Sequence, residues 1–494
     1  MNMNSTDETL RLVRQILASA GNAAELAKAT FSQPGSATTG LQTYDLEAPA
    51  KNLVPFLSPL RNRIPRVSGR GGIQANWKAV TNVSAGGMPI GVSEGLRAGS
   101  LVLSSSDVFA AYRTLGLESS VTVEAELAAE GFDDLRARAV STLLEQTMVE
   151  EEYVILGGNA THALGVTPTP SLTTTTTGGA IGATVAMSVI CMALTVEGFR
   201  LQTVATGITQ VFARSNADGT TTNINGGCAQ KSANGTVTTG AGTTNSVTAV
   251  LTPVRGAYAY AWFWGAAGSE TLGAITNVSQ VVITTAAGGG QAASALTATD
   301  YSQNTTIHDG LLGFCGNSAL NSYYAAATAG ATLTPDGAGG IVELDAALQY
   351  FYDTLRLTPA TILMSSQEAQ SIKKIVHQQG TATSLARFNF NRDGRGIVAG
   401  AIATGYLNPF ANGLELSLET HPYMPKGTVL FLTEKLPYPM NNVTNIMQIR
   451  ARRDYYQYEW PLRTRQYEYG VYTDQVLQHY FPASMGIITN LSKA

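Results

Sequence analysis

Residues 118–159 contain the longest helical pattern in the chain, and this pattern limits what the rest can fold into. Asp133 and Asp134 stand where the positive end of a helix dipole favours acids, and Gly157 with Gly158 supplies a left-handed stop. About 24 helical residues at ~1.5 Å each predict a rod of ~36 Å, which is long for a globular domain. Its apolar residues recur at helical steps and are Leu135, Ala139, Leu143, Leu144, Met148 and Ile155.

The charges on this predicted helix oppose its dipole. Arg136 and Arg138 lie near the positive end, whereas Glu150, Glu151 and Glu152 lie near the negative end. Each misplacement costs a few tenths of a kcal/mol when exposed, so we expect compensating partners from elsewhere. One alternative is a solvated acidic face. Another is a divalent cation, but consecutive helical residues point in different directions, so the cation would need further ligands.

A long β-hairpin is predicted ahead of the helix. Residues 73–81 and 98–104 are strand-like, and the stretch between them is full of turn residues. Such a hairpin has almost no core of its own and would be marginal alone in water. We therefore expect it to lie against another surface.

The stretch GFDDLRARAVSTLLEQTMVEEEYVILGGN, preceded by SSVTVEAEL, resembles the spine helix of tailed-phage major capsid proteins, whose fold is named after the Hong Kong 97 phage. The resemblance lies in the order of parts and covers residues 40–165 and 300–494. It implies an α+β, HK97-like capsid fold with an inserted all-β domain. The expected parts are an N-terminal arm (1–66), an extended hairpin loop (67–117), the spine helix and start of the peripheral domain (118–165), an inserted immunoglobulin-like domain (180–286), a peripheral domain (300–380), an axial domain (381–445) and C-terminal strands returning to the peripheral domain (446–494).

The resemblance also implies a function. It predicts a major capsid protein that self-assembles into hexamers and pentamers of an icosahedral head and encloses double-stranded DNA without sequence-specific binding. Portal, scaffolding and decoration proteins would be further partners, and no membrane is involved. The expected location is the virion, after synthesis in the host bacterial cytoplasm.

Candidate inter-subunit residues come from two places. One is the hairpin, because the family's extended loop lies across an adjacent subunit, and the other is the helix, whose mismatched charges need partners from elsewhere. Some members join subunits through a lysine on this loop, but nothing in this sequence identifies an acceptor for Lys78. The hairpin residues could equally be exposed with no special role. The residues expected at contacts between subunits are Trp77, Lys78, Arg97, Arg136, Arg138, Glu150, Glu151 and Glu152.

The composition changes abruptly after the helix. Residues 170–179 (PSLTTTTTGG) and 284–290 (TTAAGGG) are interpreted as flexible linkers that flank the inserted domain. Within it, the predicted strand 257–264 places Tyr258, Tyr260, Trp262 and Trp264 on one face, since strand side chains alternate. The favoured interpretation is a packed inner face, and the alternative is a sugar-binding platform.

The C-terminal part alternates helices and strands. Residues 341–355 have helical spacing, 361–364 predict a buried strand, and Ser365 with Glu368 predicts a capping box for a helix through Val376. From Leu407 onward the pattern is mostly strand. At the other end, Ser5 and Glu8 form a similar capping pair, and a second short helix is expected at 22–29.

Composition sets limits on function. At 494 residues two to four domains are expected, and charged residues make up only 13%, against ~25% in ordinary domains, so much of the surface should be hidden against neighbours. A net charge of -4 argues against a protein that mainly grips nucleic acid. Three cysteines without CxxC spacing predict neither disulfides nor zinc, and neither a signal peptide nor a membrane span is expected.

Enzyme chemistry is not predicted, and no cofactor or metal is expected. The five histidines lack metal spacing, His308, Asp309 and Cys315 are close only in sequence, and the DGAGG stretch at 336–340 lacks the lysine of a phosphate loop. Two other functions stay open. One is the shell of a bacterial encapsulin-type nanocompartment, and the other is a carbohydrate-binding or adhesive protein built on the β domain.

Overall fold

The computed structural model describes residues 11, 14, 48–83, 90–337, 339–378 and 404–493. The chain forms two units, one of Met1–Val54 with Glu124–Leu135 and one of Pro55–Val123 with Arg136–Ala494. The first contains most of helix α4 (Val123–Ala128). The second unit contains all the other helices and strands named below. The predictions at Ser5, Glu8, 22–29 and 381–403 lie outside the described residues.

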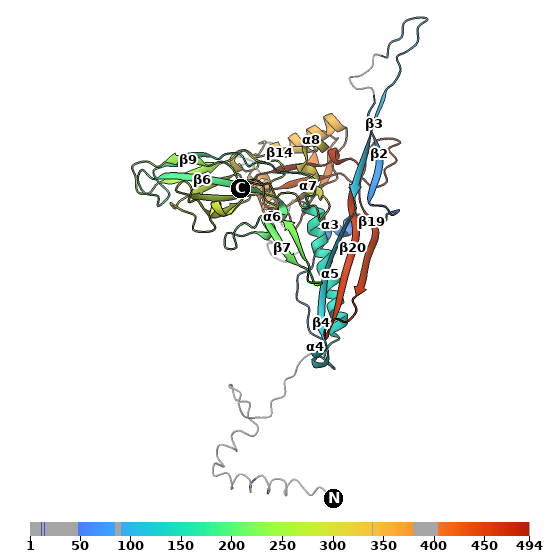
Figure 1. Ribbon diagram of the computed structural model, residues 1–494. Helices are drawn as coiled ribbons and strands as arrows, with labels where there is room; N and C mark the ends of the chain where they lie inside the picture. The colour runs from blue at the N-terminus through green and yellow to red at the C-terminus, as the bar shows by residue number, and fades with distance from the viewer. Residues whose placement is uncertain are drawn as a thin grey trace. The chain divides into compact units, whose positions relative to one another are not determined.

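A four-stranded sheet supports the long helix in the second unit. Its order is β1 (Arg66–Ser68), β19 (Met447–Glu459), β20 (Gln466–His479) and β4 (Arg113–Thr122), with β1 parallel to β19 and the other pairs antiparallel. Helix α5 (Leu135–Gly157) runs beside this sheet (Figure 1). The predicted helix is confirmed, but Asp133 and Asp134 precede it and do not form its first turn.

The face that α5 buries differs from the predicted apolar stripe. Leu143 and Ile155 are buried as expected, but Thr147 and Glu151 lie between them on the same i, i+4 row. Periodicity counts only apolar side chains, so it cannot detect a buried carboxylate that has partners elsewhere in the chain.

The predicted hairpin is present, with one correction. Strand β2 (Gln74–Val83) pairs with β3 (Leu103–Ala111), so only Leu103 and Ser104 of the predicted second strand 98–104 take part in the pairing. Gln74 pairs with Ala111 at one end of the hairpin, and Val83 pairs with Leu103 at the other. The second strand therefore lies closer to β4 than predicted, and the loop between the two strands is longer than predicted. Only Tyr112 separates β3 from β4.

A six-stranded sheet forms the C-terminal part, in the order β14 (Tyr323–Ala326), β21 (Gly486–Thr489), β18 (Val429–Leu432), β15 (Thr361–Met364), β17 (Leu414–Thr420) and β16 (Gly405–Asn408). The predicted helix and strand at 341–364 are confirmed as α8 (Val342–Leu355) and β15, and α9 (Ser366–Gln378) follows. Strand β15 shares this sheet, and α8 shares its core, with strands between residues 405 and 432.

The capping box is confirmed only in part. The Ser365 hydroxyl accepts the N–H of Gln367 at 3.2 Å, as an N-cap does. Glu368 accepts the Ser365 hydroxyl and the N–H of Gly427 at 2.9 Å. The carboxylate thus ties the start of α9 to the loop before β18.

Seven of the nine strands between residues 171 and 283 form two packed β-sheets. One has the order β13 (Gln280–Ile283), β10 (Ser246–Val250), β5 (Ser171–Thr175). The other has the order β12 (Thr271–Thr276), β11 (Ala259–Gly265), β6 (Ala186–Leu194), β9 (Gly235–Thr238). Side chains from both sheets share one core. The immunoglobulin-like expectation is not supported. In the immunoglobulin fold the first two strands lie in the same sheet, whereas here β5 lies in the three-stranded sheet and β6 in the four-stranded one.

The two segments predicted to be flexible linkers are instead ordered parts of the β domain. Residues 171–175 form β5 and pair with β10 in the register Leu172 to Ala249. Residues 284–290 pack on the same domain, where the Thr284 carbonyl accepts the Ala180 N–H at 2.8 Å. Threonine is a strand former because it is β-branched, so a threonine run is poor grounds for predicting a linker.

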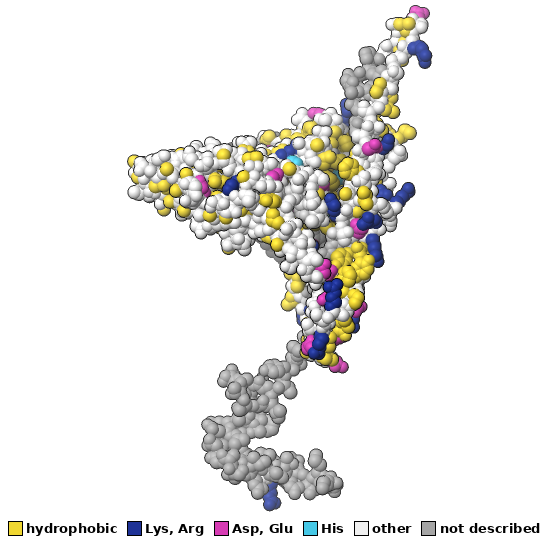
Figure 2. Space-filling view, viewed as in Figure 1, with side chains coloured by type: hydrophobic (Ala, Val, Ile, Leu, Met, Phe, Trp, Pro, Cys, Tyr) yellow, Lys and Arg dark blue, Asp and Glu magenta, His cyan; other side chains and the backbone are white. Residues whose placement is uncertain are grey.

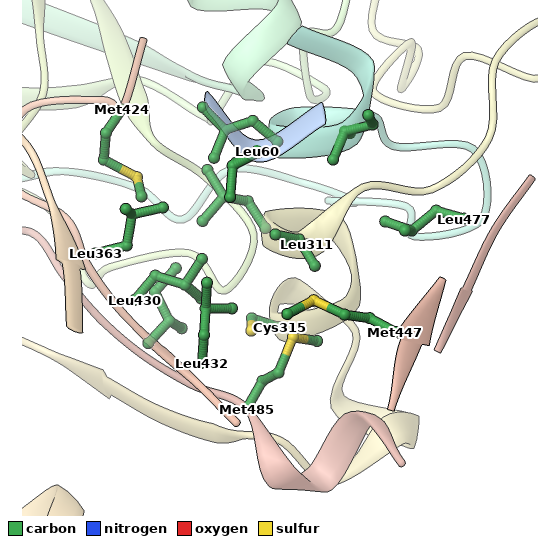
Figure 3. Close-up of a cluster of buried hydrophobic side chains, with 14 of the residues drawn as sticks. Leu60, Leu311, Cys315, Leu363, Met424, Leu430, Leu432, Met447, Leu477 and Met485 are labelled. Atoms are coloured by element: carbon green, nitrogen blue, oxygen red, sulfur yellow. The ribbon is translucent and has the colours of Figure 1, made fainter. Parts of the chain in front are cut away.

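A central core joins the six-stranded and four-stranded sheets. Leu363, Leu430 and Leu432 come from the first sheet, and Met447 and Leu477 come from the second (Figure 3). The remaining elements are α3 (Pro59–Arg63), α6 (Val196–Leu201), β7 (Val211–Ser215), β8 (Thr221–Asn225), α7 (Leu311–Gly316), η1 (Ala293–Ala295), η2 (Ser318–Leu320), η3 (Thr328–Gly330) and η4 (Pro482–Ser484). Among the described residues, no helix has the length and apolar character needed to cross a membrane.

Candidate functional site: the spine helix and the hairpin

Glu151 occupies the centre of a buried ionic cluster. Its side chain is fully buried, and its carboxylate lies 2.6 Å from Arg66 Nη1 and 3.5 Å from Arg61 Nε. It also accepts the Tyr455 hydroxyl and, at 2.8 Å, the amide of Gln475. A buried carboxylate is tolerated only when its charge is paired and its lone pairs are satisfied, and here both conditions hold.

The cluster also affects Arg66. Burial acts to lower the pKa of this guanidinium, but the hydrogen bonds to Asp454 and Glu151 outweigh burial, so its pKa is raised. Arg66 donates to Asp454 at 2.5 Å and to Gln475 at 2.8 Å. It therefore remains charged and joins β1 to α5, β19 and β20.

Glu152 caps a second element. Its carboxylate accepts the N–H of Leu60 at 2.8 Å and of Arg61 at 2.7 Å, which are orphan donors at the start of α3. His421 Nε2 lies 2.7 Å from the same carboxylate, and both side chains are at most 1% exposed. Glu151 and Glu152 thus hold the segment 58–68 onto the spine helix.

Segment 58–68 also reaches the other sheet. Arg63 lies 2.8 Å from Glu419 and 2.5 Å from Glu434, and it donates to the Thr361 hydroxyl of β15 at 2.5 Å. We call residues 58–68 the strap, because they bind α5, the four-stranded sheet and the six-stranded sheet.

The predicted compensating partners of the helix charges are present within the chain. Arg136 pairs with Glu459 at 2.9 Å and stacks on Tyr467 at 4.1 Å, and Glu150 pairs with Arg200 at 2.6 Å. Arg138 is half-buried at the same end as Arg136. Glu151 and Glu152 are buried, so the alternative of a solvated acidic face is wrong for these two residues.

The hairpin residues have few contacts by comparison. Lys78 pairs with Asp107 at 3.6 Å, with both side chains almost four-fifths exposed, and Arg97 is exposed. Trp77 is half-buried and meets Tyr480 edge-on at 5.7 Å, and its Nε1 has no hydrogen-bond partner among the described residues. The described residues of the hairpin therefore present an exposed ion pair and a half-buried indole.

Large apolar side chains are exposed at several places along the hairpin, where Figure 2 shows them in yellow among other atoms. Ile90 is 94% exposed and Leu96 is 70% exposed. Single exposed apolar residues are ordinary, but a contiguous group marks an interaction surface. The others in this group, each 49% exposed or more, are Ile73, Val80, Val83, Val92, Leu101, Val102, Leu103 and Phe109.

A groove that sequence reasoning missed runs along the edge strand β4. It consists of two adjoining hollows of about 460 and 730 Å³, which share Gly116, Leu117, Arg214 and Tyr472. We call it the edge groove. Its walls come from β4, α5, α6 and the β7–β8 hairpin, which are distant in sequence. No local pattern could have revealed it.

The other residues considered for nucleophilic or metal chemistry do not form a site within the described part of the chain. Cys315 is fully buried, and burial raises the pKa of its thiol to about 12. Burial lowers the pKa of His308, whose Nδ1 contacts the carbonyl of Asp309, not its carboxylate. No group of three metal-ligating side chains occurs in the part of the chain that is described.

Of the comparisons with known proteins, only the comparison with solved structures found similar proteins. No family model matches, and no curated protein matches. The capsid of cyanophage A-1(L) is 9% identical, with a TM-score of 0.43, over 92% of this chain and 98% of that one. The capsid of the native GTA particle is 9% identical, with a TM-score of 0.42, over 92% and 96%.

An encapsulin complex from Synechococcus elongatus is similar at 9% identity and a TM-score of 0.35, over 90% of this chain and 93% of that one. At such TM-scores the likeness carries no functional argument. The function has to be inferred from the chain's own geometry.

Proposed function

We propose that this chain is a shell-forming structural protein, the major capsid protein of a tailed double-stranded DNA phage. The observation that carries the proposal is the hairpin with its uncovered apolar side chains, mounted on a subunit whose spine helix is fixed by buried ion pairs. A hairpin of two strands is marginal in water, so it needs a partner surface. Copies of the same chain supply that surface in a closed assembly.

The finer expectations belong to this proposal. Subunits form hexamers and pentamers of an icosahedral head that encloses DNA without reading its sequence, and the protein resides in the virion. Trp77, Lys78, Arg97, Arg136, Arg138 and Glu150 are proposed to lie at or near contacts between subunits. Glu151 and Glu152 act within the subunit, since the strap covers them. The protein is proposed to have no catalytic activity.

Electron microscopy of the purified full-length chain tests the proposal. Closed polyhedral particles or free five- and six-membered rings are expected. A protein that remains monomeric at high concentration in analytical ultracentrifugation would overturn it.

A nanocompartment shell is the second candidate, because the same geometry can enclose protein cargo. Particles isolated from the native source separate the two functions. Nuclease-protected double-stranded DNA supports the phage head, and a packaged enzyme without DNA supports the nanocompartment.

The carbohydrate-binding alternative loses its basis. Tyr258, Tyr260, Trp262 and Trp264 are at most 7% exposed, so they form no platform. The predicted packed inner face is confirmed for Tyr260, Trp262 and Trp264, which share one core.

A further inference from the structure

Helix α7 is a point of attachment between the β domain and the central core. Arg255, just ahead of β11, donates from Nε and Nη2 to the Cys315 carbonyl at 3.3 and 3.1 Å, and from Nε to the Gly316 carbonyl at 3.1 Å. Tyr258 donates its hydroxyl to the Leu312 carbonyl at 2.8 Å. The last carbonyls of a helix have no partner within the helix. Side chains of the β domain therefore supply the donors that the end of α7 needs.

Helix α7 depends on its surroundings for stability. It has six residues, two of them the glycines Gly313 and Gly316, and its N-cap Gly310 makes no side-chain hydrogen bond. Glycine lowers helix propensity by about 1 kcal/mol relative to alanine, and helices this short are unstable alone in water. Leu311 and Cys315 are fully buried in the central core (Figure 3), and this burial holds the helix in place. Anything that weakens these contacts should therefore open α7 before the larger elements.

Three histidines from different segments lie around α7. His308 precedes the helix by three residues, and the ring of His479 on β20 meets Phe314 of α7 edge-on at 6.1 Å. His162 lies against the end of the helix, since a Cβ added at Gly316 would be 3.5 Å from its ring. The attachment point thus combines a helix of low intrinsic stability with groups that change charge near pH 6.5 in water.

His308 has no room for a second proton in the folded chain. Its Nδ1 lies 2.9 Å from the carbonyl of Asp309, and because a carbonyl only accepts, Nδ1 carries the proton. Its Nε2 is buried and has no hydrogen-bond partner within the described residues. Burial lowers the pKa of this imidazole, and the charges of Asp309, Glu151 and Arg66 around it do not offset that effect. A proton on Nε2 would place a buried charge there without an acceptor.

His479 is neutral for the same reason, with the opposite tautomer. The N–H of Phe481 donates to its Nδ1 at 3.2 Å, so Nε2 carries the proton, and this buried N–H also lacks a partner among the described residues. A second proton would have to bind Nδ1 and would remove the acceptor of the Phe481 N–H. Burial lowers the pKa of this imidazole to about 3, and no charged group contributes to that shift in the described part of the chain.

We propose that α7 is an acid-sensitive clamp: protonation of His308 and His479 opens the helix and releases Arg255 and Tyr258, so the β domain loses this attachment. Opening exposes both imidazoles to water, where they bind protons below about pH 6.5, and acid therefore favours the open state. The β domain has cores of its own, and so does the six-stranded sheet, so both parts stay folded when the clamp opens. This inference does not depend on the proposed function.

Hydrogen exchange of the unassembled full-length chain at pH 7 and pH 5, with exposure times scaled for the intrinsic rate, tests the clamp. Peptides that cover residues 254–258 and 308–316 should exchange at least tenfold faster at pH 5. His479 alone would favour opening about 25-fold over this interval, with a pKa near 6.5 in the open state and about 3 in the folded state. Peptides of β6 and α5 should keep their protection. Simultaneous loss in all peptides, or no loss in any, would overturn the inference.

Two sets of variants separate titration from geometry. His308→Gln with His479→Gln should remove most of the acceleration at pH 5, whereas Phe314→Leu, which changes a ring contact of α7 but no titrating group, should keep it. Arg255→Ala should speed exchange of residues 308–316 already at pH 7, because the end of α7 loses its donors. A wild-type acid response in the double variant would contradict control by these histidines, and wild-type protection in Arg255→Ala would contradict the attachment.

Discussion

Glu151 and Glu152 are adjacent carboxylates on a helix, and each is satisfied by a different set of partners. Glu151 faces two guanidinium groups, whereas Glu152 accepts two backbone N–H groups and contacts His421. Removing one member of a buried pair leaves the other charge without compensation. At the residue scale, the strap is therefore held by these charged contacts together with the burial of Leu60 and Ile64 in the central core.

Glu151→Gln should lower the free energy of unfolding by about 3–5 kcal/mol, because Arg61 and Arg66 lose their buried counter-charge. Urea denaturation of unassembled subunits measures this change. Glu150→Gln is the matched control, since the Glu150–Arg200 pair is 42% and 32% exposed and should contribute less than about 1 kcal/mol. Equal effects of the two substitutions would contradict the buried clasp.

His479 predicts a pH dependence of stability. Burial lowers its pKa from 6.5 to about 3, so the folded state holds it neutral while the unfolded state binds a proton below pH 6.5. Stability is therefore lost as pH falls from 6.5 toward 3. Between pH 6.5 and 5 the loss is about 1–2 kcal/mol, because the slope reaches 1.36 kcal/mol per unit only once the unfolded-state histidine is mostly protonated.

Denaturation at these two pH values, compared between wild type and His479→Gln, measures this contribution, and the variant should show a shallower loss. Phe314→Leu alters the ring that meets His479 edge-on without removing the titrating group, so it should retain the wild-type slope. An unchanged slope in His479→Gln would show that other groups cause the dependence.

At the scale of elements, β11 is buried on both faces. Tyr260, Trp262 and Trp264 pack in one core, and Ala259, Ala261 and Phe263 pack in another. The alternation in the sequence indicates the first face, but alanines on the second face gave no sign of burial. The strand is thus the centre of the β domain.

Trp262→Ala should destabilise the subunit by about 3–5 kcal/mol, because it leaves a cavity and removes the hydrogen bond of Nε1 to Thr276 at 2.8 Å. Thermal unfolding measures the loss. Val282→Ala on the exposed side of β13 is the control and should change stability by less than about 0.5 kcal/mol. A tolerated Trp262→Ala would indicate that the two sheets are not held by this core.

At the scale of the whole molecule, apolar side chains occupy two kinds of place: the buried core, where they stabilise the subunit, and the exposed hairpin, where we expect them to serve assembly. The core shared by the two sheets is fully buried, whereas the hairpin keeps its apolar side chains in water. Substitutions in these two places should therefore separate folding from association.

The double substitution Ile90→Ser with Leu96→Ser should leave the melting temperature of isolated subunits unchanged and raise the concentration needed for assembly. Burying each side chain contributes about 1.5–3 kcal/mol, and each 1.4 kcal/mol corresponds to a tenfold change. Light scattering against protein concentration measures the shift. Leu407→Ser with Leu414→Ser, both exposed in the six-stranded sheet, is the matched control. Assembly at the wild-type concentration would show that the hairpin is not part of the contacts between subunits.

Local patterns in the sequence determined the elements themselves: the long helix, the hairpin, α8, β15 and the aromatic strand β11. They succeed because helical and strand periodicity reflect one-sided burial. They fail where burial comes from distant partners. Glu151 and Glu152 look like a solvated acidic run, the threonine run looks like a linker, and the edge groove has no linear signal. Only the tertiary structure decided these features, because the partners of each lie tens to hundreds of residues away in the chain, as Arg66 does from Glu151 and His421 from Glu152.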